Sequence, residues 1–254
     1  MNPIYENDWI KLYQGDCLEI MPQLDITFDV CITDLPYGTT QNQWDNIIPF
    51  EQMWKELNRL VKETGAIILF GQDKFTAKLI LSNEQNHRYN LIWKKGNRPS
   101  GFLNANRQPL RIHEDMCVFY QSQPTYHPQM TCGAINHSKG KMNKKQKNYC
   151  YGDFQDVLSS MDGMKFPVSV IDIDKPHPQI YPTQKPTALI EYLIKTYTNE
   201  NELILDFTAG SGTTGLAAME TNRRCVLIEK DENACSLIKD RIIKKETIIK
   251  ERLF

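Results

Sequence analysis

The chain has 254 residues, of which 41% are hydrophobic and 24% are charged, and its formal net charge is −1. This length suits one large domain or one domain with an inserted lobe, and the composition is ordinary for a folded soluble protein. No apolar stretch approaches the roughly 20 residues that a membrane helix needs, and the N-terminus lacks the basic and apolar regions of a secretion signal. The net charge alone argues neither for nor against a nucleic-acid partner.

Strands and helices alternate in the first half of the chain. We expect strands at 28–34, 66–70, 89–93 and 115–120, and helices at 49–63 and about 73–82. The strands are short continuous apolar runs, whereas in the first helix the apolar residues recur every three or four positions. Such a pattern predicts an α/β fold with a mostly parallel sheet that helices cover on both faces.

Residues 122–180 interrupt this alternation with several prolines and scattered tyrosines and histidines, so we interpret them as an inserted region. No acidic residue occurs between Asp115 and Asp153, but five lysines do: Lys139, Lys141, Lys144, Lys145 and Lys147. A solvated loop and a stripe that contacts phosphate groups both explain this run. The alternation then resumes, with a helix expected at 187–198, strands at 202–206 and 224–229, and a final helix from about 232.

The seven cysteines include no Cys-x-x-Cys pair, and several of them lie inside apolar runs. We therefore expect reduced thiols that pack as small core residues of a cytoplasmic protein. Their spacing does not fit a zinc site, so no metal is expected.

A glycine turn follows the strand that ends at Asp206. Gly210, Ser211 and Gly212 stand directly before a helix, where backbone N–H groups and the helix dipole favour an anionic ligand group. No lysine precedes the Ser/Thr residues, which disfavours ATP or GTP. Glu229 ends the next strand and can accept bonds from ribose hydroxyls. These features predict a nucleoside-containing cofactor and leave NAD and S-adenosylmethionine open.

The segment Asp34-Leu35-Pro36-Tyr37 leaves the first apolar strand. An exocyclic amine of a base is a poor nucleophile, because its lone pair is delocalised into the ring, so it must be held by hydrogen-bond acceptors. The carboxylate of Asp34 and the carbonyl of Leu35, restrained by Pro36, supply such acceptors. The ring of Tyr37 offers a face on which a flipped base can stack.

These segments resemble the amino-methylating DNA methyltransferases of the permuted β group. DLPY at 34–37 is similar to their D-P-P-Y motif, and DFTAGSGTTG at 206–215 is similar to their cofactor motif. YPTQKP at 181–186 and YQGDCLEIMPQL at 13–24 are similar to two further family elements. Leu35 replaces a proline and Tyr181 a histidine, but neither change removes a required functional group. The resemblance runs from about 10 to 245 and is weakest over 122–165.

The resemblance implies a Rossmann-like methyltransferase fold, with residues 1–121 and 181–254 forming the catalytic domain and 122–180 the target-recognition region. It implies that Asp34, Leu35, Pro36 and Tyr37 hold the target amine. It places the following residues around S-adenosylmethionine: Asp16, Cys17, Asp34, Gln184, Lys185, Asp206, Phe207, Ala209, Gly210, Ser211, Gly212, Thr213, Thr214 and Glu229. Lys185 is expected to bind the carboxylate of the cofactor.

The implied partner is double-stranded DNA. Asn104, Arg107, Gln108 and Arg111 lie on an expected loop, and we place them near DNA, where Arg can contact phosphate or guanine and Asn or Gln can read adenine. The lysine run gains a DNA-binding interpretation beside that of a solvated loop. A homodimer and a cognate restriction enzyme stay open, as does the recognition sequence.

The acidic first residue of DLPY favours adenine over cytosine as the target base. We therefore expect an enzyme that transfers a methyl group from S-adenosylmethionine to the N6 amine of a flipped adenine. Methylation of the N4 amine of cytosine is the main alternative. A catalytically inactive DNA-binding module is a second alternative, and the intact Asp34, Tyr37 and glycine turn argue against it. An NAD-dependent oxidoreductase would leave DLPY without a role.

Overall fold

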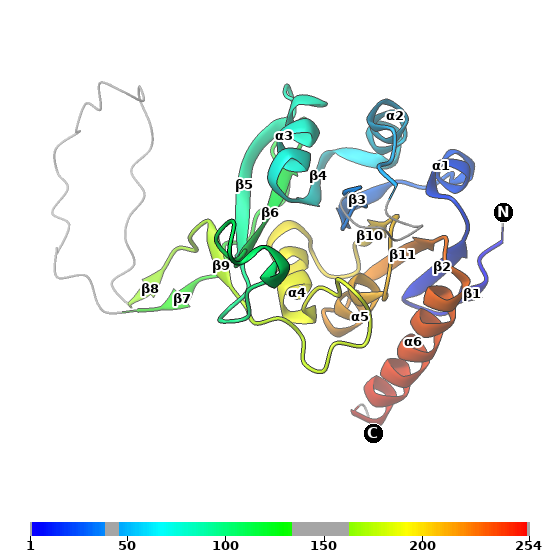
Figure 1. The fold of residues 1–254 in the computed structure, drawn as a ribbon. Coiled ribbons are helices and arrows are strands. Elements are labelled where there is room, and N and C mark those ends of the chain that lie inside the picture. Colours follow the sequence, from blue (N-terminus) through cyan, green and yellow to red (C-terminus); the bar gives the residue numbers. More distant parts are fainter. Residues whose placement is uncertain (1, 39–45, 134–162, 253–254) are drawn as a thin grey trace, which may run out of the picture. The chain divides into compact units, whose positions relative to one another are not determined.

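The structure, a computed structural model, describes residues 2–38, 46–133 and 163–252. Within these ranges the main sheet has nine strands in the order β1-β2-β11-β10-β3-β4-β6-β5-β9 (Figure 1). The strands are β1 Tyr5–Glu6, β2 Ile10–Gln14, β3 Phe28–Thr33, β4 Val61–Gly71, β5 His87–Lys94, β6 His113–Phe119, β9 Val170–Asp172, β10 Leu203–Asp206 and β11 Arg224–Glu229.

The centre of the sheet is parallel and its margins are mixed. Strands β2, β11, β10, β3 and β4 run in one direction, whereas β6 is antiparallel to both β4 and β5. The predicted fold class, a mostly parallel sheet with helices on both faces, is confirmed. The connection 95–112 contains no α-helix, whereas a parallel partner is usually reached through a helical crossover.

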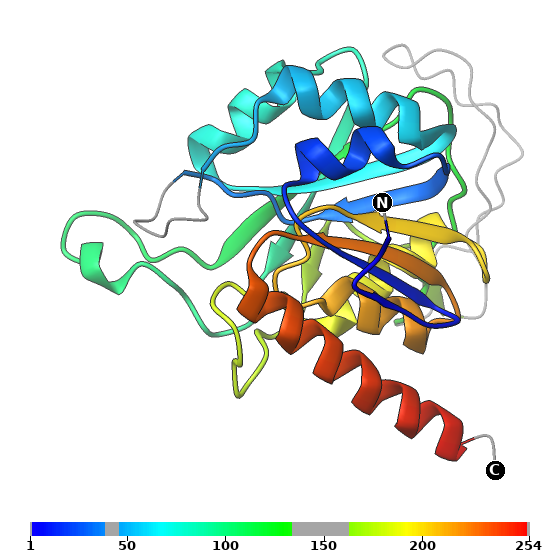
Figure 2. The same cartoon turned by 90° about the vertical axis from the view of Figure 1, so that its right-hand side faces the viewer.

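Two groups of helices cover the two faces of the sheet (Figure 2). One face holds α1 Cys17–Ile20, the 3₁₀ turn η1 Met21–Gln23, α2 Phe50–Leu60 and α3 Asp73–Leu81. The other face holds α4 Thr187–Tyr197, α5 Thr213–Glu220 and α6 Glu232–Arg252. A further 3₁₀ turn, η2 Phe102–Asn104, lies between β5 and β6.

Strand β3 is a continuous apolar run because helices cover both of its faces. Val30 and Ile32 pack into the core beneath α4, α5 and α6, whereas Cys31 packs into the core beneath α2 and α3. All three side chains are fully buried. Successive side chains of a strand point to opposite faces, so a strand that is covered on both sides must be apolar at every position.

The parallel strands place the candidate residues along one edge of the sheet. In strand order, Asp16 follows β2, Glu229 ends β11, Asp206 ends β10 and Asp34 follows β3, and Gly71 ends β4. Ligands of open α/β sheets bind outside the carboxyl ends of the strands. The first half of the chain thus meets the glycine turn of the second half at this edge.

The boundaries of two predicted elements differ from the structure. Helix α2 ends at Leu60 rather than 63, because Val61 is already extended and pairs with Phe28 of β3. Strand β9 lies inside the region predicted to be inserted, yet it extends the main sheet beside β5.

The chain divides into two compact units, residues 1–127 with 169–254, and residues 128–168. The predicted insertion, 122–180, is therefore wider than the separate unit. In its described part, β7 Thr131–Cys132 pairs with β8 Met164–Lys165 in an antiparallel ladder. The five lysines at 139–147 lie outside the described residues. Among the helices that the structure describes, none has the length and apolar character to cross a membrane.

Candidate active site

The turn after β3 presents a carboxylate and an aromatic ring side by side. The hydroxyl of Tyr37 donates to Oδ1 of Asp34 at 2.7 Å, and the Tyr37 ring lies 4.9 Å from the ring of Phe75, between centroids. The side chain of Asp34 is 25% exposed. Leu35, in contrast, is buried in the core with α2 and α3, so this substitution for the family's proline adds packing there.

Asp34 stands at one end of a row of four charges. The ammonium of Lys185 binds Oδ2 of Asp34 and also lies 3.2 Å from Oε2 of Glu114. The other oxygen of Glu114 binds the ammonium of Lys95. Both lysine side chains are buried, and the Lys185 ammonium lies 4.9 Å from the centre of the Phe70 ring. Two positive and two negative groups alternate, so each buried charge has a partner of opposite sign.

Burial and charge act in opposite directions on these groups. Burial raises the pKa of Asp34; the Lys185 ammonium lowers it, but Glu114 raises it again, and the pKa stays above its ordinary value. Burial alone would raise the pKa of Glu114, but Lys185 and Lys95 hold it below its ordinary value. Burial lowers the pKa of Lys185, but Asp34 and Glu114 outweigh it, so the pKa of Lys185 is raised. The site therefore keeps Lys185 protonated.

Hydrogen bonds join the ends of β3 and β10. The hydroxyl of Thr208 donates to the backbone carbonyl of Asp34 at 2.9 Å. The hydroxyl of Thr33 donates to Oδ1 of Asp206 at 2.6 Å and lies 2.7 Å from that of Thr208. Burial raises the pKa of Asp206 to about 6, although hydrogen bonds from the side chains of Thr214 and Thr33 and from the backbone N–H of Thr208 oppose the rise. Because Thr208 stands two residues before Gly210, these bonds hold Asp34 next to the glycine turn.

Glu229 organises the glycine turn from the neighbouring strand. Its Oε2 accepts the N–H of Gly210 at 2.6 Å, and its Oε1 accepts the N–H groups of Lys230 and Asp231 at 2.8 and 2.9 Å. The N–H of Gly212 donates to the carbonyl of Ala209. Two of the N–H groups expected to bind an anion are therefore used within the protein. Gly212 has a φ of +72°, and a Cβ there would lie 2.9 Å from Ile238, so no larger residue fits without strain.

The segment 180–186 lies against this turn. The Tyr181 ring would stand 3.4 Å from a Cβ at Gly210, and burial raises the pKa of Tyr181 to about 12. The side-chain oxygen of Gln184 accepts the N–H of Ile180 at 3.2 Å. Lys185 then reaches Asp34. We expected its ammonium to bind a cofactor carboxylate, but in the structure it binds two protein carboxylates.

The other predicted cofactor residues fall into two groups. Asp16 caps α1 by accepting the N–H of Leu18, and its second oxygen binds Lys230 at 3.1 Å, which places it beside the end of β11. Most of the remaining residues are buried: Cys17 at the start of α1, and Phe207, Ala209, Ser211, Thr213 and Thr214 in or beside the glycine turn. Phe207 packs in the core with α2 and α3.

The predicted DNA-binding residues of the first unit lie on the segment 95–112 between β5 and β6. Asn104, Arg107 and Gln108 are exposed. Arg111 differs, because its Nη1 donates to Gln72 and Asp73, both at 3.0 Å. Arg111 thus anchors the segment to the end of β4.

Sequence reasoning missed Glu114 and Lys95. Both stand near the ends of β6 and β5, and their pairing depends on the antiparallel register in which Trp93 faces Glu114. The only signal for Glu114 in the sequence was its place at the start of the apolar strand HEDMCVF. Many surface carboxylates occupy such a place, so the signal did not single it out.

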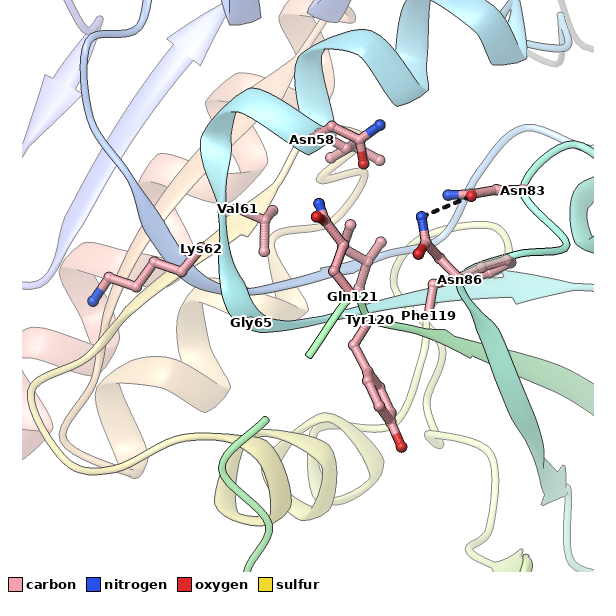
Figure 3. Close-up of a pocket in the computed structure, with 11 residues that line it drawn as sticks. Asn58, Val61, Lys62, Gly65, Asn83, Asn86, Phe119, Tyr120 and Gln121 are labelled. Carbon is pink, nitrogen blue, oxygen red and sulfur yellow. Dashed lines mark hydrogen bonds between the residues drawn. The ribbon is translucent and has the colours of Figure 1, made fainter. Parts of the chain in front are cut away.

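A small pocket of about 10 Å³ lies away from this edge (Figure 3). It is lined by residues such as Val61 at the start of β4 and Phe119 at the end of β6, together with Asn83 and Asn86, which share a hydrogen bond of 2.9 Å. A cavity of this size holds about one water molecule. The candidate site therefore lies at the carboxyl edge and not in this pocket.

A parallel sheet that joins DLPY, a glycine turn and an acidic strand end at one edge defines a Rossmann-like methyltransferase. The chain belongs to the DNA methylase family, whose model matches residues 28–240. It is therefore a DNA amino-methyltransferase, as its motifs predicted.

Individual proteins agree with this assignment along nearly the whole chain. The type II methyltransferase M2.MboI of Moraxella bovis is 27% identical over 271 residues, which cover 95% of this chain and 91% of that protein. M.HinfI of Haemophilus influenzae is 23% identical over 266 residues, which cover 93% of this chain and 69% of that protein.

Solved structures show the same fold. The M1.HpyAVI–SAM complex superimposes with a TM-score of 0.62 at 24% identity, over 91% of this chain and 99% of that chain. The PvuII DNA methyltransferase, which is cytosine-N4-specific, gives a TM-score of 0.68 at 15% identity, over 94% of this chain and 88% of that chain.

Proposed function

We propose that this DNA methyltransferase moves the methyl group of S-adenosylmethionine to the exocyclic N6 amine of an adenine that is flipped out of duplex DNA. The observation that supports this most directly is the junction of β3 and β10. There Thr208, two residues before the glycine turn, donates to the backbone of Asp34 at 2.9 Å. An acceptor for the amine and the turn proposed to hold the methyl donor therefore lie within one hydrogen-bonded cluster.

The side chains of the turn after β3 suit an exocyclic amine. The carboxylate of Asp34 and the carbonyl of Leu35 accept the two N–H groups of the amine, which draws its lone pair out of conjugation with the ring. The Tyr37 ring, backed by Phe75 at 4.9 Å, stacks on the base. Each Asp34 oxygen already accepts one bond, from Tyr37 or from Lys185, and keeps a second lone pair for the incoming amine. Holding the amine in place supplies much of the rate.

The edge of the sheet fits S-adenosylmethionine. When bound, this cofactor supplies an electrophilic methyl group on a sulfonium. Glu229 makes three backbone bonds and keeps one lone pair, on Oε2, for a ribose hydroxyl. Gly210, with a φ of +52° and no side chain beneath Tyr181, leaves bare backbone for close approach. Asp16, next to Lys230, is proposed to meet the adenine of the cofactor.

Adenine is proposed over cytosine because the residue at position 34 is acidic, as is more usual for adenine enzymes of this family. Methylation of cytosine N4 is the runner-up, and the cytosine-N4-specific PvuII enzyme shows that the same fold serves that reaction. Both bases present an amine of the same chemistry, so the product decides between them.

The partner is proposed to be double-stranded DNA, with residues 122–180 as the target-recognition region. Homodimer formation and a cognate restriction enzyme stay predictions, as does the cytoplasmic location. An inactive DNA-binding module is disfavoured, because Asp34 binds both Tyr37 and Lys185 and its backbone accepts a bond from Thr208 beside the glycine turn.

The test is methyl transfer from labelled S-adenosylmethionine to duplex DNA of mixed sequence, followed by digestion to nucleosides. The proposal predicts label in N6-methyladenine. Label in N4-methylcytosine would select the runner-up, and no label from the wild-type protein would favour the inactive module.

A further inference from the structure

Two large apolar side chains stand in solvent at the tip of the segment 95–112. Phe102 is 68% exposed, and Leu103, in the middle of η2, is 102% exposed. In Figure 2 this green segment projects from the sheet with the short helical turn at its end. Large apolar side chains in such a position usually mark a surface for a partner.

The segment is held in a defined shape at its base. Ser100 and Arg111 exchange backbone hydrogen bonds of 2.8 and 2.9 Å, and the side chain of Arg111 binds Gln72 and Asp73 at the end of β4. At the tip, the N–H of Ala105 donates to the carbonyl of Phe102 at 3.1 Å. A preformed turn loses less conformational freedom on binding than a flexible one.

The composition of the segment identifies the chemistry of its partner. From Gly96 to His113 there is no acidic residue, whereas Arg98, Arg107 and Arg111 are basic. Asn104, Asn106 and Gln108 follow the two apolar residues and are exposed. Arginine side chains can bind the phosphates of DNA, and side-chain amides can bind its base edges. Neighbouring apolar side chains can insert between stacked bases.

The base of the segment is joined to the candidate active site by the row of charges. Lys95, its first residue, binds Glu114, which lies 3.2 Å from Lys185, which binds Asp34. Since β6 pairs with β4, the segment also leaves the sheet at the edge from which Asp34 projects. DNA whose target base reaches Asp34 therefore passes this side of the sheet.

We propose that Phe102 and Leu103 form an apolar wedge that enters the base stack of duplex DNA and fills the space left by the flipped target base. This inference rests on the proposed DNA substrate and base flipping, and it holds for adenine and cytosine alike. Flipping breaks stacking with both neighbouring bases. The wedge replaces part of that stacking by contacts with the Phe102 ring and the Leu103 side chain, while the flanking polar residues bind the backbone.

The experiment compares single-turnover methyl transfer by the wild-type protein and the variant Phe102→Ala/Leu103→Ala on two duplexes. Both duplexes contain the recognition sequence, mapped beforehand on plasmid DNA methylated by the wild-type protein. One duplex is fully paired, and the other has an abasic site opposite the target base. An unpaired base is cheaper to flip. We expect the variant to be slower by about 30-fold on the paired duplex and by less than about 3-fold on the other.

Leu81→Ala is the matched control, because Leu81 is 71% exposed at the end of α3 and is not part of the segment. It should match the wild type on both duplexes. The double variant should keep the wild-type melting temperature, because both side chains are exposed. Equal losses on the two duplexes, or no loss on the paired one, would overturn the wedge. The identity of the methylated nucleoside tests the proposed function separately, because the ratio of variant to wild-type rates on the two duplexes does not depend on which base is methylated.

Discussion

The ammonium of Lys185 binds the carboxylate of Asp34, although 151 residues separate the two in the chain. The contact joins two segments that the sequence motifs had assigned to different tasks, Asp34 to the target amine and Lys185 to the cofactor. In the structure, Lys185 donates to Asp34 as an incoming amine must. We infer that the target amine either shares the Asp34 carboxylate with Lys185 or displaces the ammonium from it.

Replacing Lys185 by Gln should move the acid limb of the pH profile of kcat to higher pH. The carboxylate of Asp34 must be ionised to accept the amine, and the Lys185 charge lowers its pKa. Without that charge the pKa of Asp34 rises further, and activity is lost earlier as pH falls. Initial rates at saturating DNA and cofactor from pH 5 to 9 would measure this. Lys195→Gln, which breaks an exposed 3.7 Å ion pair with Glu191, is the control. An unmoved limb would contradict the inferred electrostatic role.

Replacing Glu114 by Gln should move the same limb in the opposite direction. The Glu114 carboxylate raises the pKa of Asp34, so an uncharged side chain of the same shape lowers it, and activity persists to lower pH. The amide can still bind Lys95 or Lys185, which limits structural change. A shift to higher pH in both variants would show that they act through misfolding of the site rather than through charge.

Replacing Asp206 by Asn should stabilise the protein near neutral pH but not at pH 4. The folded-state pKa of Asp206 is about 6, above its ordinary value of 3.8, so the native state binds this proton more tightly than the unfolded state. That stabilisation is complete below 3.8 and is lost as pH rises through 6. Asn does not ionise. The free energy of unfolding of the variant, relative to that of the wild type, should therefore increase by on the order of 3 kcal/mol as pH rises over this range.

Urea unfolding of the wild type and Asp206→Asn at pH 4 and pH 7.5 would measure the two free-energy differences. Any fixed cost of the altered hydrogen bonds with Thr33 and Thr208 is the same at both pH values. Only the change with pH therefore reports the ionisation. A difference that does not vary with pH would show that burial does not raise the pKa of Asp206.

The sheet and its functional edge could be predicted from the sequence because both follow local rules. Buried parallel strands require continuous apolar runs such as Phe28–Thr33, and a residue that follows such a strand must lie at the carboxyl edge. Asp34, Asp206 and Glu229 each follow or end a run of this kind. Their convergence therefore needed only the strand direction and not the side-chain geometry.

The row of charges could not be predicted, because it depends on long-range register. Glu114 reaches Lys185 only because β6 reverses direction beside β4, and Lys95 reaches Glu114 from the neighbouring antiparallel strand. Strand β9 was not predicted for a related reason. β9 pairs with β5, which is distant in sequence, and the prolines around it had suggested a loop.

The most direct test of the account is the variant Asp34→Ala, assayed for methyl transfer to DNA and for S-adenosylmethionine binding by calorimetry. The account predicts that transfer falls by at least about 1,000-fold, because the amine loses its charged acceptor. Cofactor affinity should stay within about 3-fold of the wild type, because Glu229 and the glycine turn are unchanged. Turnover near the wild-type rate, with the cofactor bound normally, would contradict the role of Asp34 on which the proposed mechanism depends.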